Sequence, residues 1–379
     1  MMKGSRMAMH EGLNIRFLKL LGYFSLLIVV FILFSLPTRL VGAETKKQET
    51  EHYCLSCHSN PDLSMELPDG ETLSLFISPE TIENSTHSQE GIECEACHTE
   101  IKGYPHPEIE YQSKRELSRA YYLSCRKCHS ANYEKTLDSI HAKAAEAGNL
   151  DAPVCTDCHG AHSIQAFDQP RAIVSKTCGR CHEDVFDQYI ESIHGGALIG
   201  ENNPDVPLCT DCHGVHNIQD PGSPQFHSST PDLCAGCHAD PELMQKYGLS
   251  SNVYNLYELS WHGVDVSVYK AMWPTIRHES AVCTDCHGIH NIRSAQDPKS
   301  MVYPDNLLQT CQKCHKDASP NWTSAWTGHN EISLERTPYL FYVKQFYITF
   351  SRLVLWLSIA YVGLQLLRSI VNRVRRSIA

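Results

Sequence analysis

Residues 155–162 read CTDCHGAH, and nearly the same eight residues return at 209–216 and again at 283–290. Each stretch contains the five-residue unit Cys-X-X-Cys-His, which occurs nine times in the 379-residue chain. The nine copies use all eighteen cysteines, which are Cys54, Cys57, Cys94, Cys97, Cys125, Cys128, Cys155, Cys158, Cys178, Cys181, Cys209, Cys212, Cys234, Cys237, Cys283, Cys286, Cys311 and Cys314. A pattern that leaves no cysteine over points to one chemistry for all of them.

Cys-X-X-Cys-His is the spacing at which c-type haem is attached to a polypeptide. The two thiols form thioethers with one porphyrin, and the histidine that follows binds the iron as its proximal ligand. We therefore predict nine covalently bound haem c groups with the proximal ligands His58, His98, His129, His159, His182, His213, His238, His287 and His315.

Other uses of cysteine fit this pattern less well. A disulfide framework suits an exported, cysteine-rich chain, but it does not require a histidine after every second cysteine. Structural zinc uses paired Cys-X-X-Cys knuckles, or cysteine and histidine at longer offsets. A redox pair of the thioredoxin type needs a single Cys-X-X-Cys in a βαβ context, which is not visible here.

The haem motifs belong to a longer repeat. A unit begins with Ser-X-His, continues to a Cys-X-X-Cys-His with a further histidine behind it, and ends at a second Cys-X-X-Cys-His. Close copies begin at Ser139, Ser192 and Ser260, and a looser copy begins at Ser85. A single motif at Cys54 precedes the four units.

The extra histidines of this repeat equal the motifs in number. Four units supply two each and one more stands before the C-terminal apolar segment, which gives His87, His106, His141, His162, His194, His216, His262, His290 and His329. We expect these nine to be the distal iron ligands. His52, His227 and His278 lie outside the repeat and are interpreted as surface or spare histidines. No methionine recurs with the repeat, and the absence of Met/His ligation predicts haems of low potential.

Three of the expected distal ligands follow a proximal histidine by only three residues. His162, His216 and His290 cannot reach the other face of the same haem on so short a tether. Each is therefore expected to bind the iron of a neighbouring haem. The alternative is that these histidines only cap the turns that follow Gly160, Gly214 and Gly288.

Composition indicates what replaces an ordinary core. Mean hydropathy is −0.30, and few long apolar runs lie between residues 50 and 335, so we expect a haem-centred fold of short helices and loops with little or no β structure. Helices are expected around residues 130–147, 183–193 and 253–272. The formal net charge of −11 argues against nucleic acid and against docking on anionic lipid.

Both ends of the chain carry apolar segments. Basic residues precede an apolar run from Leu20 to Leu36 and the small-residue site that ends at Ala43, which is typical of a secretory signal. Cleavage after Ala43 is the favoured interpretation of residues 1–43, and an uncleaved anchor is the alternative. Residues 44–335 then form a haem domain in the periplasm or another extracytoplasmic space.

Residues 336–368 are expected to form an interfacial and transmembrane helix, because about 20 apolar residues cross a bilayer core. Residues 369–379 contain Arg373, Arg375 and Arg376, so the positive-inside rule places this tail in the cytoplasm. Trp322 and Trp326 precede the span as interfacial aromatic residues. Arg352 interrupts it, either reaching to the headgroups or contacting a propionate, a quinol or a partner helix. The alternative for the segment is a buried amphipathic helix.

The repeat of Cys-X-X-Cys-His-Gly-X-His with a leading Ser-X-His resembles the low-potential polyhaem c-type cytochromes. These include the class III type and the membrane-anchored cytochromes of anaerobic respiration, and the resemblance covers residues 52–329. It implies haems in alternating parallel and perpendicular pairs. It also implies electron exchange between a quinone-linked, cytochrome b-type membrane subunit and periplasmic redox proteins. The anchor here is C-terminal, whereas that of the quinol-dehydrogenase group is N-terminal.

These observations predict an electron-transfer protein rather than an enzyme: a membrane-tethered cytochrome with nine haems. The first alternative is a multihaem reductase of a small nitrogen or sulfur compound at an open haem. Such a haem usually shows an altered motif, whereas all nine motifs here end in histidine. The second alternative is the subunit of an extracellular filament, against which the C-terminal span argues.

Overall fold

The computed structural model describes residues 53–166, 170–325, 328–329 and 331–378. The chain divides into two compact units, Met1–Tyr53 and Cys54–Ala379, and all but the last residue of the first unit lies outside the described residues. The expected signal segment, His52 and Trp326 also lie outside them.

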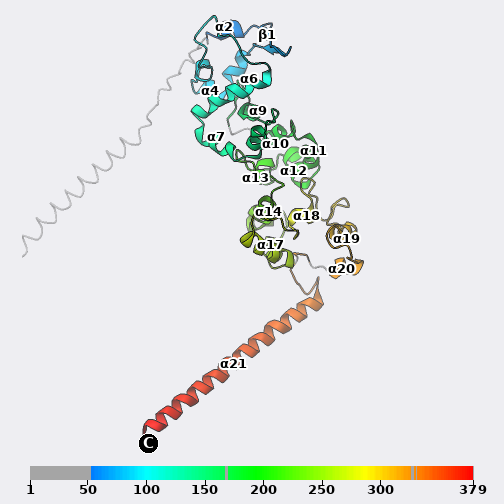
Figure 1. Cartoon of the computed structure of the whole chain (residues 1–379). Helices are drawn as coiled ribbons and strands as arrows, with labels where there is room; N and C mark the ends of the chain where they lie inside the picture. Colours follow the sequence, from blue (N-terminus) through cyan, green and yellow to red (C-terminus); the bar gives the residue numbers. More distant parts are fainter. Residues whose placement is uncertain (1–52, 167–169, 326–327, 330, 379) are drawn as a thin grey trace, which may run out of the picture. The chain divides into compact units, whose positions relative to one another are not determined.

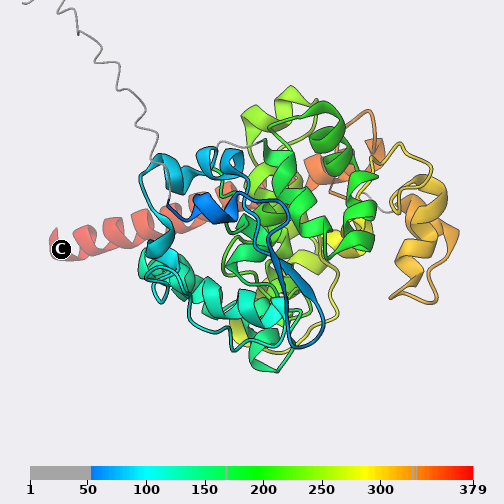
Figure 2. The same cartoon turned by 90° about the horizontal axis from the view of Figure 1, so that it is seen from above.

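The second unit is built from short helices and loops, as Figures 1 and 2 show. The only strands in the described part of the chain are β1 (Ser64–Glu66) and β2 (Thr72–Ser74), an antiparallel hairpin in which Met65 faces Leu73. The helices in this part are α2 (Leu55–His58), α3 (Pro79–Glu83), α4 (Thr86–Gln89), α5 (Cys94–Cys97), α6 (Lys114–Tyr121), η1 (Tyr122–Lys127), α7 (Ser130–Leu137), α8 (Ile140–Glu146), α9 (Cys155–His159), α10 (Arg171–Gly179), α11 (Glu183–Ile190), α12 (Ile193–Glu201), α13 (Cys209–His213), α14 (Pro224–His238), α15 (Pro241–Lys246), α16 (Val253–Glu258), α17 (Trp261–Met272), α18 (Cys283–His287), α19 (Pro304–Gln312), α20 (Pro320–Ala325) and α21 (Pro338–Ile378). The expected fold class is confirmed.

Each of the three expected helical stretches is two helices rather than one. The breaks fall at Ser139, Ser192 and Ser260, the serines of the Ser-X-His triplets. Their backbone is extended, and each serine Oγ accepts a hydrogen bond from the amide three residues on, at 2.9–3.2 Å. A side-chain oxygen in this position satisfies an amide that has no partner inside the helix. The triplet therefore starts a new helix and places its histidine in the first turn.

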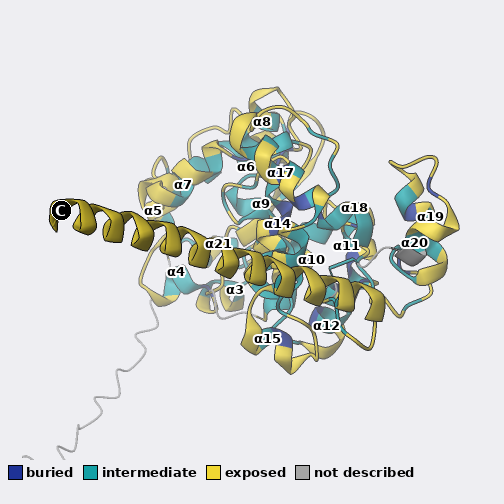
Figure 3. Cartoon of the chain, turned by 90° about the horizontal axis from the view of Figure 1, so that it is seen from below, coloured by how far each residue is buried: buried dark blue, intermediate teal, exposed yellow. Residues whose placement is uncertain are grey.

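The apolar core of the described residues is small. Tyr189, Leu198 and Leu208 form a buried cluster between α11, α12 and the loop before α13. Most other residues are intermediate or exposed, as the colours of Figure 3 show. Because hydrophobic stabilisation grows with the apolar area removed from water, this chain needs apolar groups other than its side chains to complete its interior.

Successive repeat units are joined by one backbone hydrogen bond that recurs in three places. The amide of the residue after the Ser-X-His serine donates to a carbonyl two residues beyond the further histidine of the next unit. The pairs are Thr86 to Ile164, Ile140 to Ile218 and Ile193 to Ile292, each at 2.8 Å. Each bond therefore brings two extra histidines from adjacent units close together.

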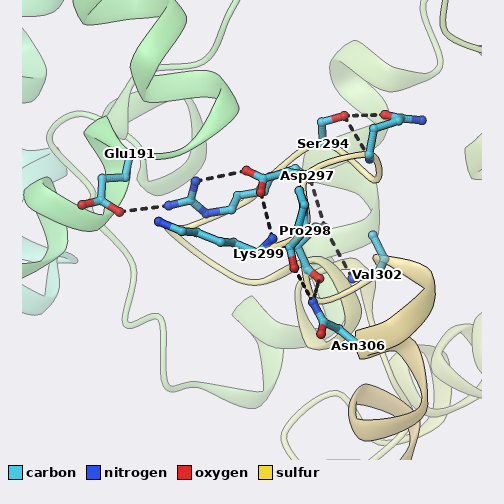
Figure 4. Close-up of polar contacts among 10 residues, drawn as sticks. Glu191, Ser294, Asp297, Pro298, Lys299, Val302 and Asn306 are labelled. Carbon is cyan, nitrogen blue, oxygen red and sulfur yellow. Dashed lines mark hydrogen bonds and ion pairs between the residues drawn. The ribbon is translucent and has the colours of Figure 1, made fainter.

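An arginine reinforces the last of these joints. Arg293 contacts Glu191 at 2.9 Å and Asp297 at 3.2 Å, and so links the end of α11 to the loop after α18 (Figure 4). The same loop is closed by Asn306, whose amide donates to the carbonyls of Pro298 and Ser300. Partly buried charge pairs of this kind fix the register of a joint more than they stabilise it.

Candidate functional site: nine facing histidine pairs

The Cys-X-X-Cys-His motifs are helical, either as a short helix of their own, as in α9, or at the end of a longer helix, as in α14. In the first motif the amide of His58 donates to the carbonyl of Cys54 at 3.0 Å, and the same bond recurs at His98, His129, His182 and His315. One turn of helix brings the first cysteine and the histidine onto the same side. None of the eighteen cysteines forms a disulfide, so each motif keeps both of its sulfur atoms for thioether bonds.

In the three CTDCH motifs the aspartate has a structural task that the sequence did not reveal. Asp157, Asp211 and Asp285 each accept a hydrogen bond from the backbone amide just before their motif, at 2.6–2.9 Å. Each also contacts a nitrogen-bearing side chain from another helix, which is Arg115, Arg171 and His227 respectively. The aspartate therefore both caps the turn that carries the haem cysteines and docks it.

Every proximal histidine faces one distal histidine. Ring centroids lie 5.8–6.2 Å apart in all nine pairs, which are His58 with His106, His98 with His162, His129 with His87, His159 with His216, His182 with His141, His213 with His290, His238 with His194, His287 with His329 and His315 with His262. Each of the eighteen predicted ligands is used once.

The constant spacing fits a metal between the rings. Two metal–nitrogen bonds of about 2 Å each, together with the radii of two imidazole rings, add up to roughly 6 Å. Directly stacked rings are closer: Tyr269 and His278 lie 3.5 Å apart in this chain. No group of three or more His, Cys, Asp or Glu that could hold a metal occurs among the described residues. Each pair would hold the iron of one haem, which would supply the electron-transfer chemistry.

Hydrogen bonds and burial prepare several of these rings for a metal. The Nδ1 atoms of His58 and His106 lie 2.7 and 2.9 Å from the carbonyls of Leu75 and Gly103, which leaves Nε2 of both rings for iron. Burial, followed by the neighbouring histidines, lowers the pKa of His194 and of His287 to about 4. These rings are neutral at pH 7, which is the form that binds metal.

The pairs follow a rule that the sequence did not determine. A Ser-X-His histidine faces the second motif of its own unit, as His194 faces His238. A histidine after Gly-X faces the first motif of the preceding unit, as His216 faces His159. The positive φ angles of Gly160, Gly214 and Gly288, between 75° and 87°, reverse the chain after the proximal histidine. Turn formation and pairing with a neighbouring motif therefore occur together.

The last two motifs are paired in an order that chain position does not suggest. His329 stands nearest the C-terminal apolar helix in sequence, yet it faces His287 of the eighth motif at 5.8 Å. The ninth motif is paired with His262, from the start of α17. The final unit is thus closed by a histidine from the segment leading to α21.

The cysteines show which motifs are neighbours. The first cysteine of an adjacent motif, together with burial, raises the pKa of Cys94, Cys155, Cys178 and Cys234; the adjacent cysteines are Cys54, Cys125, Cys209 and Cys283 respectively. Second cysteines join the remaining neighbours: after burial, the thiols of the next motif help to raise the pKa of Cys97, Cys158, Cys212 and Cys286. The two kinds of contact alternate, so each motif adjoins the ones before and after it in the sequence.

The histidines outside the repeat are held by carboxylates. His278 stacks on Tyr269 and contacts Asp265, which also accepts a hydrogen bond from Ser280. His227 lies 3.1 Å from Asp285. Neither faces a proximal histidine, as expected for non-ligands, but both are part of the packing rather than spare.

Comparison with known proteins agrees with this geometry. Residues 86–183 match the family described as Cytochrome c3, and residues 203–243 match the Doubled CXXCH motif. The chain is a multihaem c-type cytochrome. Multiheme cytochrome MtrA of Shewanella baltica is 25% identical over 214 residues, which cover 52% of this chain and 56% of the relative.

A second relative covers a shorter stretch. Cytochrome c-type protein NrfB of Escherichia coli O6:H1 is 29% identical over 153 residues, or 39% of this chain and 70% of the relative. Of the first relative, MtrA, the chain matches only about half the length. These likenesses establish haem c and electron transport as the shared chemistry of the chain and its relatives.

Within the described residues, one apolar helix is long enough to cross a membrane. α21 has 41 residues, and the apolar window within it has a mean hydropathy of 1.7 and no buried residue. The alternative of a buried amphipathic helix does not fit, because no residue of α21 between Pro338 and Ile378 is buried. A membrane anchor fits the helix.

Proposed function

We propose that this cytochrome binds nine haems, each with two histidine ligands, and carries electrons between a membrane partner and redox proteins in the periplasm. The observation that carries the proposal is the one-to-one pairing of nine proximal with nine distal histidines at a constant separation. An iron with two protein ligands has no position left for a substrate. It can exchange electrons without changing its ligands.

The neighbour contacts of the cysteines suggest the route. Since each haem would hang from its two cysteines, contact between the thiols of adjacent motifs would bring the edges of the haems together. Electrons would then pass along the series in chain order, from the motif at Cys54 to the motif at Cys311, or in reverse. The eighth and ninth haems would lie nearest the anchor along the chain, because the eighth takes its distal ligand from the segment that leads to α21.

The membrane partner proposed here is a quinone-linked, cytochrome b-type subunit. The support for it is α21, which fits an anchor, and the proximity in sequence of His329 to that helix. The negative net charge favours basic or mixed-charge surfaces on the periplasmic partners. Residues 44–335 form the proposed haem domain, residues 336–368 the interfacial and membrane helix, and residues 369–379 the cytoplasmic tail.

Reduction of the haems by quinol in native membranes tests this role. A quinol analogue is added to membranes that contain the full chain, and haem reduction is followed by the α-band absorbance. The haems are expected to be reduced within the mixing time of a stopped-flow experiment. A chain that ends at Thr337 keeps all nine pairs and is expected to lose at least 90% of that rate. Equal rates for the two chains, or no reduction by quinol, would show that α21 does not bring the haems to a quinol-linked donor.

A further inference from the structure

A continuous apolar seam runs along the whole of α21. Counting from Tyr339 in alternate steps of four and three residues gives twelve positions that end at Ile378. All twelve residues, both ends included, are apolar. We call these positions the α21 seam. Figure 3 shows α21 as exposed along most of its length, and none of its residues is buried. The seam begins before the membrane-spanning part and continues past it into the arginine-rich tail.

Most of the information lies at the C-terminal end of the helix, since most residues between Tyr339 and Leu367 are apolar in any case. After Leu367 the helix carries arginine, serine and asparagine, yet the seam positions are Val371, Val374 and Ile378. The only other apolar residue between 368 and 378 is Ile370. Apolar residues thus return at intervals of three and four where the rest of the helix is polar.

The period of the seam favours a partner helix over lipid alone. A straight α-helix drifts by about 20° per seven residues relative to a strict seven-residue repeat, so such a repeat stays on one face only if two helices wind around each other. Left-handed supercoils with a mean spacing of 3.5 residues do this. Lipid contact within the hydrocarbon core needs apolar residues but imposes no such period, whereas a helix on the bilayer surface follows the 3.6-residue period of a straight helix.

The length of the helix leads to the same conclusion. Its 41 residues extend about 60 Å, whereas a bilayer with its headgroups is roughly 40–45 Å thick. Part of the seam therefore lies beyond the lipid. Val371, Val374 and Ile378 are 42%, 49% and 79% exposed, and apolar side chains outside the membrane are stabilised when another protein surface covers them.

The seam is complementary to itself. Every copy of a single-span chain crosses the membrane in the same direction, so two α21 helices pair in parallel and place like positions opposite each other. In that register Arg368 lies opposite Gly363 of the other copy, and Arg375 lies opposite Ile370 of the other copy. The cations therefore do not face each other, and the arginine stems can cover the edges of the seam.

We propose that α21 pairs with α21 of a second copy as a parallel, in-register coiled coil that runs from the outer membrane surface into the basic tail. The cytochrome is then a dimer held by its anchor. The pairing depends on the pattern of α21 alone, so it stands or falls separately from the proposed electron route.

Cysteine cross-linking tests the pairing with little background, because all native cysteines lie in haem motifs. The full-length holoprotein in lipid nanodiscs is compared as Val371→Cys, Val374→Cys, Asn372→Cys and Arg373→Cys variants under mild oxidation. The seam variants are expected to form disulfide-linked dimers at least 10-fold faster than the other two, since a disulfide needs Cα atoms within about 7 Å. Equal rates at all four positions, or no dimer at any, would overturn the proposal.

The mass of the particle in detergent provides an independent readout. Val371→Asp with Val374→Asp is expected to shift the protein from dimer to monomer in light scattering. Ser369→Asp with Asn372→Asp adds the same charge off the seam and is expected to leave the dimer intact. A monomeric unmodified protein, or cross-linking of the seam cysteines in native membranes to a different protein in place of a second copy, would contradict self-pairing.

Discussion

Replacement of His290 by alanine is expected to convert one of the nine irons from low spin to high spin. His290 lies three residues after His287 in the sequence, but its ring faces His213 at 6.0 Å. The haem attached to Cys209 and Cys212 should therefore lose its distal ligand, and the haem of the His287 motif should be unaffected. Spin quantification by EPR on the oxidised protein should give one high-spin iron per chain.

His278→Ala is the matched control, since His278 contacts Asp265 and Tyr269 and faces no proximal histidine. It should leave all irons low spin. Two further variants, each without the cysteines of one haem motif, identify the affected haem. In a chain with Cys209→Ala and Cys212→Ala, His290→Ala should add no high-spin signal, whereas with Cys283→Ala and Cys286→Ala it should. The reverse assignment would show that His290 binds a different iron.

Gly195→Ala is expected to destabilise the protein and to disturb the ligand beside it. A Cβ atom at Gly195 would collide with the carbonyl oxygen of Tyr189, because α12 turns tightly against the end of α11. Overpacking of this kind costs about 1–3 kcal/mol, which corresponds to a fall in Tm of several degrees. His194 should move with the helix, so the iron bound to His238 should show partial high-spin character.

Gly196→Ala is the matched control for this change. A Cβ at Gly196 would have Ile190 O as its nearest neighbour at 3.6 Å, an ordinary contact. Because alanine reduces the freedom of the unfolded chain, Tm should stay the same or rise slightly. Gly263→Ala should behave like Gly195→Ala, since its Cβ would meet the carbonyl of Tyr257 in the corresponding turn. Equal Tm values for Gly195→Ala and Gly196→Ala would refute the packing argument.

The sequence predicted the composition of the site but not its connections. Spacing and number predicted which eighteen histidines would belong to the site, and these are the histidines that face each other in nine pairs. Which distal histidine faces which proximal one depends on the backbone bonds between units, such as Ile193 to Ile292. Those bonds join residues 78 to 99 positions apart and have no signature in either segment alone.

The regions of local structure were predicted, but the breaks within them were not. Helices were expected in the right regions, but the serine that starts each Ser-X-His triplet divides them, as Ser192 does between α11 and α12. The polar triplet and its N-cap serine could have indicated that break. The role of Asp211 could not have been found, because its partner Arg171 comes from α10, 40 residues earlier.

EPR spectroscopy of the oxidised full-length protein, with haem quantified per chain, tests the central claim most directly. Nine facing histidine pairs predict about nine haems per chain and only low-spin signals. A stoichiometric high-spin signal in the unmodified protein, or far fewer than nine haems, would contradict a cytochrome in which every iron is held between two histidines.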